Sequence, residues 1–437
     1  MAAGTQQRKV AAVVVTLVAL LSWTAAAQPR HEPDGLDSDE IGLMGNAGHV
    51  ADSTKPTVTA YFEQESYRRG DAARLVVTDS AAPVSVRVFR AGGESRPTLV
   101  HDVMVGRPVT KAIPIGTVDG RRVVPIRIGD WPSGVYFVRL LAPGARVGFA
   151  PFVLRPTRLG EHRIAVVMPT QTWQAYNFRD DNGDGHPDTW YAGWKTHTAR
   201  LVRAFLDRGV PPHWSHYDAP FVRWLVRTHR DVDFLSDAEL RTVGSGKDLA
   251  RAYDLIVFSG HHEYVTSHEY DVVTQYRDLG GNLAFLAAND FFWKITIANH
   301  VMTRVAQWRD LGRPEAALIG VEYRANDRGG HRGPWILTQG SETTPWLFAR
   351  TGLSTGGGVG LGGIEIDATC DASPKSVRVL ADIPNLYGPG FTAQMTYYET
   401  PAGAKVFAAG AFSLARSVWD PGVSTLVANL WQHLSTP

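Results

Sequence analysis

The sequence predicts an all-β, immunoglobulin-like sandwich followed by an α/β domain with a doubly wound, mostly parallel sheet. Residues 56–157 contain short runs in which apolar and polar residues alternate, the pattern of half-buried antiparallel strands. From residue 160 to residue 437, unbroken apolar runs alternate with segments of helical period, which is typical of parallel strands joined by crossover helices. A chain of 437 residues is also longer than one ordinary domain.

Five β-rich runs define the predicted sandwich, at residues 57–62, 73–78, 84–89, 123–128 and 135–141. Glycine and proline turn signals separate them. Val84, Val86 and Val88 are separated by polar residues, so this strand is expected to bury one face. We expect the sandwich to pack against the second domain or to shape the entrance to a site in that domain. A separate carbohydrate-binding role stays open.

In the α/β domain, strands are expected at 164–168, 213–216, 231–234, 254–259 and 282–288. Helices are expected at 196–208, 221–230, 267–279 and at the C-terminus. The last helix has an apolar stripe made of Val423, Leu426, Val427, Leu430, Trp431 and Leu434. Thr266 and Glu269 have the spacing of a capping box that would start the helix at 267. The glycine-rich region 311–399 lacks the spacing of nucleotide-binding loops and is predicted to form loops and β insertions.

Composition and charge limit the kinds of partner that the sequence predicts. The chain has 44 Lys and Arg against 43 Asp and Glu, a formal charge of +1, so charge gives no argument for nucleic acid or an anionic membrane surface. Its 44% hydrophobic content is that of a globular protein. Cys370 is the only cysteine, which rules out an intramolecular disulfide.

Residues 1–27 have the pattern of a secretory signal peptide. Arg8 and Lys9 precede an apolar run at 10–21, and alanines at 25–27 supply a cleavage site before Gln28. The alternative is an uncleaved anchor, but the run is shorter than the roughly 20 residues that span a bilayer. We therefore expect an exported protein, secreted or kept at the cell envelope, without a membrane span after cleavage. Residues 28–55 are acidic and aperiodic, and are expected to form a disordered linker.

Polar residues crowd the turn after the predicted strand 254–259. Gly260 ends this strand, and His261, His262, Glu263 and Tyr264 follow it. In open α/β sheets, ligands bind at the carboxyl ends of the strands, so a site is expected here. The alternative is that these side chains cap the next helix and face water.

Two further polar stretches are expected on the same rim of the sheet, at 169–177 with Tyr176 and at 213–218 with Tyr217. Two phenolate oxygens and one carboxylate form a hard, anionic ligand set that suits Fe(III) better than zinc. A free tyrosine has a pKa of about 10, so only a strongly Lewis-acidic ion would keep two phenols deprotonated near neutral pH.

From about Tyr61 onward, the sequence resembles the N,N-dimethylformamidase large (beta) subunit-like family. The resemblance rests on WPSGVY at 131–136, TWQAYN at 172–177, GHHEY at 260–264 and the segment 280–289, which starts with GGN and ends at Asn289. It implies a class I glutamine amidotransferase-like, flavodoxin-like parallel sheet behind the sandwich. It also implies a mononuclear Fe(III) site formed by Tyr176, Tyr217 and Glu263.

The resemblance further implies hydrolysis of a non-peptide amide C–N bond in a small-molecule substrate. His261 would then be the proton carrier, with His262 and Asn289 as further candidate catalytic or orienting residues. A small accessory subunit or a homo-oligomer stays an open expectation. The chain is shorter than the family's enzyme between Tyr217 and Glu263.

The nucleophile of glutamine amidotransferases is missing from this sequence. Their cysteine sits on the turn after a central strand, where this chain has Ser259, Gly260 and His261, while Cys370 lies in the glycine-rich region. This excludes a Cys–His–Glu triad. The alternative from a different functional class is a catalytically silent, exported binding protein that recognises a saccharide or another cell-envelope ligand through its many aromatic side chains.

An acidic loop gives a second cation signal. Asp180, Asn182, Asp184 and Asp188 stand at positions 1, 3, 5 and 9 of a calcium-loop pattern, with a glycine at position 6. The glutamate that an EF-hand needs at position 12 is replaced by Tyr191. We expect a calcium-binding loop that fixes the neighbouring loop, which carries Tyr176. The alternative is a surface loop made of Asx turns.

Overall fold

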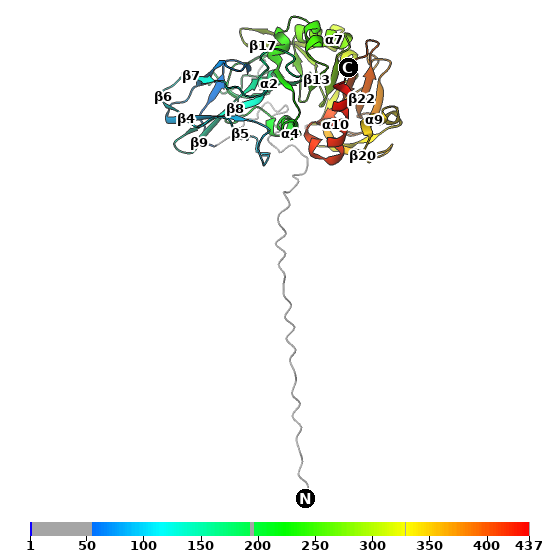
Figure 1. Cartoon of the computed structure of the whole chain (residues 1–437), viewed down its shortest axis with the longest axis horizontal. Coiled ribbons are helices and arrows are strands. Elements are labelled where there is room, and N and C mark those ends of the chain that lie inside the picture. Colours follow the sequence, from blue (N-terminus) through cyan, green and yellow to red (C-terminus); the bar gives the residue numbers. More distant parts are fainter. Residues whose placement is uncertain (2–54, 193–195, 328, 437) are drawn as a thin grey trace. The chain divides into compact units, whose positions relative to one another are not determined.

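The computed structural model describes Met1 and residues 55–192, 196–327 and 329–436 (Figure 1). Apart from Met1, the predicted signal peptide at 1–27 lies outside the described residues, as does the predicted linker up to residue 54. Within the described part of the chain, no helix has the length and hydropathy needed to cross a membrane.

Two all-β sheets form the N-terminal part. Their strands are β1 (Ala60–Phe62), β2 (Ser66–Tyr67), β3 (Ala72–Val77), β4 (Ala81–Arg90), β5 (Arg107–Pro108), β6 (Ile113–Val118), β7 (Arg122–Arg127), β8 (Gly134–Ala142) and β9 (Arg146–Leu154). One sheet has the order β1-β3-β7, and the other has the order β2-β9-β8-β4-β5 with β6 paired to β4. Residues of both sheets, among them Leu75, Val86 and Val138, form one core. The immunoglobulin-like identity of this sandwich stays a prediction.

An 11-stranded mixed sheet organises the second part. Its parallel strands are β10 (Ile164–Met168), β12 (Asp233–Ser236), β13 (Leu255–Phe258), β15 (Asn282–Phe285) and β23 (Lys405–Ala408), in the order β12-β10-β13-β15-β23. Its antiparallel strands are β18 (Glu322–Asn326), β19 (Arg332–Leu337), β20 (Gly358–Ala368), β21 (Arg378–Ile383), β22 (Ala393–Glu399) and β24 (Ala411–Phe412). The glycine-rich region thus supplies β insertions, as predicted, and they extend the sheet beyond its parallel strands. The amidotransferase-like identity of this part stays a prediction.

Helices cover both faces of the parallel strands. The α-helices are α2 (Thr170–Ala175), α3 (Trp214–Tyr217), α4 (Ala219–Arg227), α5 (Asp237–Thr242), α6 (Gly246–Ala252), α7 (Ser267–Asp278), α8 (Ala316–Ile319), α9 (Pro345–Phe348) and α10 (Pro421–Leu434). The 3₁₀ helices are η1 (Trp190–Ala192), η2 (Arg309–Leu311), η3 (Gln339–Thr343) and η4 (Arg416–Trp419). In β10, Val166 packs in the same core as α4 and α10, whereas Val167 packs in the same core as α7. This alternation follows from the two-residue period of a strand.

Three local predictions are confirmed. All residues of β13 are buried, as expected for a strand covered on both faces. Thr266 and Glu269 form the predicted capping box at the start of α7. The predicted apolar stripe of α10 is buried along its whole length.

The predicted helix at 196–208 is wrong. Thr198–Arg200 instead form β11, which joins a four-stranded sheet with β14 (Tyr264–Val265), β16 (Trp293–Ala298) and β17 (Val301–Gln307). Further along, the buried Arg203 guanidinium donates hydrogen bonds to the backbone carbonyls of Gln174 and Asn177. Strand pairing and these long-range bonds override the local amphipathic pattern.

The predicted strand at 213–216 is also wrong. His213 has a φ of 60°, and the next four residues form the one-turn helix α3. A left-handed residue cannot continue a strand. Tyr217 therefore reaches the candidate site from a helix and not from a strand end. The strand predicted at 231–234 begins two residues later, as β12.

Candidate functional site

The turn after β13 places a buried carboxylate against a phenol. Glu263 Oε2 accepts a hydrogen bond of 2.8 Å from Tyr176 Oη. Tyr176 ends α2, which follows β10, and β10 pairs in parallel with β13. The two side chains therefore come from the carboxyl ends of neighbouring parallel strands, where the topology predicts a site.

Two further phenols surround Glu263, and the sequence analysis assigned neither of them to a metal site. Tyr191 Oη lies 3.0 Å from Glu263 Oε2 and 2.8 Å from Tyr176 Oη. The hydroxyl of Tyr264 in turn hydrogen-bonds with that of Tyr191. The sequence did contain a signal that Tyr191 could be a ligand, because this tyrosine replaces the expected glutamate at position 12 of the acidic loop.

His261 links this group to a second carboxylate. Its Nε2 lies 3.4 Å from Glu263 Oε2 and 3.4 Å from Glu365 Oε2. Asn289 Nδ2 lies 3.5 Å from the same nitrogen. Sequence reasoning missed Glu365, which lies on β20. The available signal was the alternation of Ile364, Glu365, Ile366 and Asp367, which places two carboxylates on one face of a strand.

Burial controls the protonation of these groups. It raises the pKa of Glu263 to about 7, although the hydrogen bonds from Tyr176 and Tyr191 act in the opposite direction. Burial and the charge of Glu263 raise the pKa of Glu365 well above its ordinary value. Burial also lowers the pKa of His261 well below its ordinary value, and His213 and His262 act in the same direction. Near pH 7, His261 is therefore a neutral proton acceptor, and burial favours the protonated form of Glu365.

Tyr217 lies on the wall of a small cavity next to this group. Its ring stacks on His213 and on Phe412, with centroid distances of 4.9 and 5.0 Å. Tyr176, His213 and His261 line the same cavity, whose volume is about 10 Å³. The structure thus brings Tyr217 and Tyr176 to one cavity, and the role of Tyr217 as a metal ligand stays a prediction.

His262 and Asn289 occupy different surroundings. The His262 ring packs edge-on against Phe258, and its Nδ1 lies 3.1 Å from the carbonyl oxygen of Gly260. Among the described residues, no hydrogen bond or ion pair joins it to Tyr176, Glu263 or Glu365. Asn289 is held next to His261 because its backbone N–H donates to the Asp367 carboxylate. The catalytic roles of both residues stay predictions.

The site contains oxygen atoms, the type of donor that hard cations prefer. Several buried polar atoms around it have no hydrogen-bond partner within the described part of the chain, namely Thr172 Oγ1, Asp218 Oδ1, Asn289 Oδ1 and Glu365 Oε2. Such atoms are unfavourable unless another group satisfies them. The described residues contain no group of three or more His, Cys, Asp or Glu side chains that could hold a metal ion. Tyr176, Tyr191 and Glu263 nevertheless place three oxygen donors in mutual contact.

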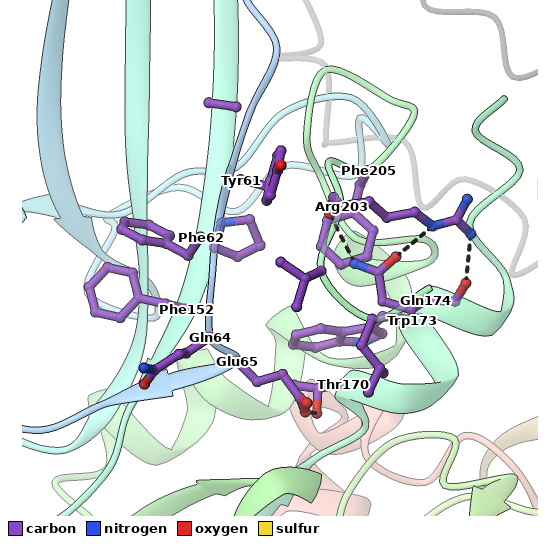
Figure 2. Close-up of a pocket in the computed structure, with 14 residues that line it drawn as sticks. Tyr61, Phe62, Gln64, Glu65, Phe152, Thr170, Trp173, Gln174, Arg203 and Phe205 are labelled. Carbon is purple, nitrogen blue, oxygen red and sulfur yellow. Dashed lines mark hydrogen bonds between the residues drawn. The ribbon is translucent and has the colours of Figure 1, made fainter. Parts of the chain in front are cut away.

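The sandwich packs against the helix that carries Tyr176. Figure 2 shows Tyr61 and Phe62 of the sandwich across from Trp173 and Phe205, around a cavity of about 50 Å³. In the same view, Arg203 is hydrogen-bonded to Gln174 of α2. The sandwich thus contacts α2, the helix that Tyr176 ends. Its role in shaping the entrance to the site stays a prediction.

The oxygens of the acidic loop accept hydrogen bonds from the backbone of the loop. Asp180 accepts from the N–H groups of Gly183 and Gly185, and Asn182 accepts from that of Asp184. In the same way, Asp184 accepts from His186 and Asp188 accepts from Asp181. These are the Asx-type turns of the alternative interpretation. Calcium binding by this loop stays a prediction.

Together, the fold and the site define a class of protein: a β-sandwich joined to an α/β domain with a buried phenol–carboxylate–imidazole site at the strand ends. A family model described as N,N-dimethylformamidase beta subunit-like, C-terminal, matches residues 121–420. The chain belongs to the N,N-dimethylformamidase beta subunit-like family.

Individual relatives match only in part. The N,N-dimethylformamidase beta subunit of Paracoccus aminophilus is 28% identical over 155 residues, which cover 34% of this chain and 20% of that protein. The chain thus spans about a fifth of the length of this curated relative. A superoxide reductase (neelaredoxin) from Ignicoccus hospitalis is 11% identical, with 23% of this chain and 82% of that chain covered and a TM-score of 0.15. A carbohydrate acetylesterase from Xanthomonas citri is 10% identical, with 80% and 95% covered and a TM-score of 0.16.

Proposed function

We propose that this protein is an exported, metal-dependent hydrolase that cleaves the C–N bond of a small-molecule amide. One observation carries the proposal: Glu263 is a buried carboxylate in contact with both the Tyr176 phenol and the His261 imidazole. Membership of the family supports a related hydrolase at the level of the class. Export is supported by the predicted signal peptide. The Paracoccus relative is named a beta subunit, which supports an assembly of several subunits.

The donor set is the reason for proposing Fe(III). Tyr176 and Glu263 would hold the ion, with Tyr217 as the further phenolate. Burial raises the pKa of Tyr176 well above its ordinary value, and the nearby Glu263 charge acts in the same direction. A strong positive charge is therefore needed to ionise this phenol. When bound, such an ion would polarise the substrate carbonyl and lower the pKa of a water molecule.

His261 and Glu365 are the proposed proton-transfer pair. The neutral imidazole accepts, at Nε2, the proton that the attacking water loses. The Glu365 carboxyl group, 3.4 Å from the same nitrogen, donates its proton to the amide nitrogen as the amine leaves. Asn289 orients the imidazole through its side-chain amide. All of these side chains are buried, which keeps bulk water out of the proton transfers.

The test is amide hydrolysis by protein purified with iron supplied. Release of amine from a series of small formamides and acetamides is measured for the wild type, His261→Ala and Glu365→Gln. We expect each change to lower the rate about 100-fold or more, because general acid–base catalysis contributes at least this much. Bound metal should stay unchanged. His331→Ala, which alters an exposed histidine, is the matched control.

Two outcomes would contradict the proposal. In the first, no amide of the series is hydrolysed by iron-loaded wild-type protein. In the second, His261→Ala keeps the full rate.

A further inference from the structure

A groove between the sandwich and the end of α4 concentrates positive charge. It has a volume of about 840 Å³, and none of its lining residues lines the small cavity beside Tyr176. Its charged lining residues are Arg96, Arg107, Arg139, Arg208, Arg227 and a single acid, Glu94. We call it the arginine groove. Five arginines against one glutamate stand out in a chain whose formal charge is only +1.

Aromatic rings form part of the groove wall. Phe89 and Phe137 stack with their centroids 5.2 Å apart, and Phe149 meets Phe137 edge-on. The Arg139 guanidinium lies over the Phe89 ring, 4.6 Å from its centroid. The groove volume falls in the range of small-molecule sites, roughly 300 to 1,000 Å³. A ligand could therefore contact apolar surface and guanidinium groups together.

Part of this positive charge has no counterion among the described residues. Arg208 pairs with Asp102 at 3.4 Å, and Glu94 lies 4.0 Å from Arg223. Within the described part of the chain, no carboxylate forms an ion pair with Arg96, Arg107 or Arg139.

Arg139 stands out among these arginines. Its Nε is buried and has no hydrogen-bond partner among the described residues. Burial and the neighbouring charge of Arg87 lower the pKa of this guanidinium. A guanidinium charge in positive surroundings is stabilised best by an anion.

We propose that the arginine groove binds a small organic anion with an aromatic body. Its carboxylate would be held by Arg139 and Arg107, because the planar guanidinium matches a carboxylate with two parallel hydrogen bonds. The aromatic body would lie against the partly exposed apolar side chains of the groove, Val103, Val105 and Leu141. This site is independent of the proposed amide hydrolysis, because the two sets of lining residues do not overlap.

The probe is 2-naphthoate, titrated into the full-length protein by calorimetry. The neutral 2-naphthalenemethanol keeps the aromatic body and should bind at least about tenfold more weakly, as expected when a charge-assisted pair is lost. Arg139→Gln and Arg107→Gln should each weaken naphthoate binding about tenfold. Arg127→Gln changes an exposed arginine on β7, in the other sheet of the sandwich, and should leave binding unchanged. Thermal unfolding checks that each variant is folded.

Three results would overturn the proposal: absent naphthoate binding, equal binding of the acid and the alcohol, and full binding by both arginine variants. If Arg139→Gln fails to fold, the exposed Arg107 decides the question alone. Inorganic phosphate that competes with an affinity equal to that of naphthoate would also count against the aromatic part of the proposal, because the rings would then contribute nothing.

Discussion

At the scale of single residues, Glu263 connects the two halves of the candidate site. One of its neighbours is the Tyr176 phenol, which suits metal binding, and another is the His261 imidazole, which suits proton transfer. Glu365 adds a second carboxylate next to the same imidazole nitrogen. The charge on one residue of the candidate site therefore affects the pKa values of its neighbours. A substitution at Tyr176 should therefore change metal binding, and a substitution at His261 should change proton transfer.

We expect iron-loaded wild-type protein to be coloured, because electron density moves readily from a phenolate into empty orbitals of Fe(III). Tyr176→Phe keeps the volume of the ring and removes the donor oxygen, so the visible absorbance per protein should fall to a small fraction. Tyr217→Phe should have the same effect if the ligand set implied by the family resemblance holds. Visible absorption and elemental analysis of the same samples measure both the colour and the metal content.

Tyr264→Phe is the matched control for these variants. Tyr264 is a buried phenol that contacts Tyr191 and is not assigned to the metal. The Tyr264→Phe variant should therefore keep most of the colour. Colourless wild-type protein that binds neither iron nor another transition metal would refute the proposed centre. Full colour in Tyr217→Phe would instead remove Tyr217 from the ligand set and make Tyr191 the candidate.

At the scale of elements, the acidic loop and helix α2 act as one support for Tyr176. Arg203 pairs with Asp181 of the loop at 3.3 Å and donates to the backbone carbonyls at the end of α2. Only 4% of Arg203 is exposed, so this link is shielded from solvent. Ordering the loop should therefore stabilise the segment that presents Tyr176.

Calcium should raise the melting temperature of the wild type by binding the folded loop. At a concentration of 100 times the dissociation constant, such binding contributes about 2.7 kcal/mol. Asp184→Ala removes one predicted ligand and should abolish this effect. It also removes a hydrogen bond to the His186 N–H, so the variant should lose about 1 kcal/mol even without calcium. Thermal unfolding with calcium and with a chelator measures both effects.

Asp371→Ala, at another exposed aspartate, should respond to calcium as the wild type does. If the wild type unfolds at the same temperature in calcium and in chelator, the loop is held by its Asx turns alone.

The elements also show what local sequence could reveal. Strand β13 and helix α10 were predictable because their burial follows from their own periodicity. Helix α3 and strand β11 were not, because the first depends on a left-handed His213 and the second on pairing with the distant β17. The same limit applies to the site. Glu263 follows a predictable strand, whereas Glu365 comes from an insertion whose pairing partners no local pattern defines.

At the scale of the whole molecule, a buried polar network joins the sandwich to the α/β part. Both the Thr170 hydroxyl and Arg241 bind Glu65 of the sandwich. Asp237 accepts from the N–H of Gln171, whose side chain donates to Glu269 Oε1 at 2.8 Å. The network thus ties the β1–β2 region to α2, α5 and α7. With one cysteine in the chain, noncovalent contacts of this kind hold the two parts together.

This network should make the protein less stable as the pH rises through the range from about 4.5 to about 7. Burial raises the pKa of Glu269 to about 7, from an ordinary value of 4.5. Between these two values, the folded protein holds a proton that the unfolded chain releases, so unfolding is favoured as the pH rises. The full effect for this residue is on the order of 3 kcal/mol. Thermal unfolding in chelator from pH 5 to pH 8 measures it.

Glu269→Gln isolates this contribution, because glutamine is neutral at every pH and can still accept the hydrogen bond from the Thr266 N–H. The melting temperature of this variant should fall less steeply with rising pH than that of the wild type. Glu342→Gln, at an exposed glutamate, should keep the wild-type slope. Asp237 is buried in the same network, and its raised pKa acts in the same direction, so the variant should flatten the slope without abolishing it. Parallel curves for the wild type and Glu269→Gln would show that Glu269 is already ionised in the folded protein at pH 5. The network would then be held by the charge of Arg241 and not by a shared proton.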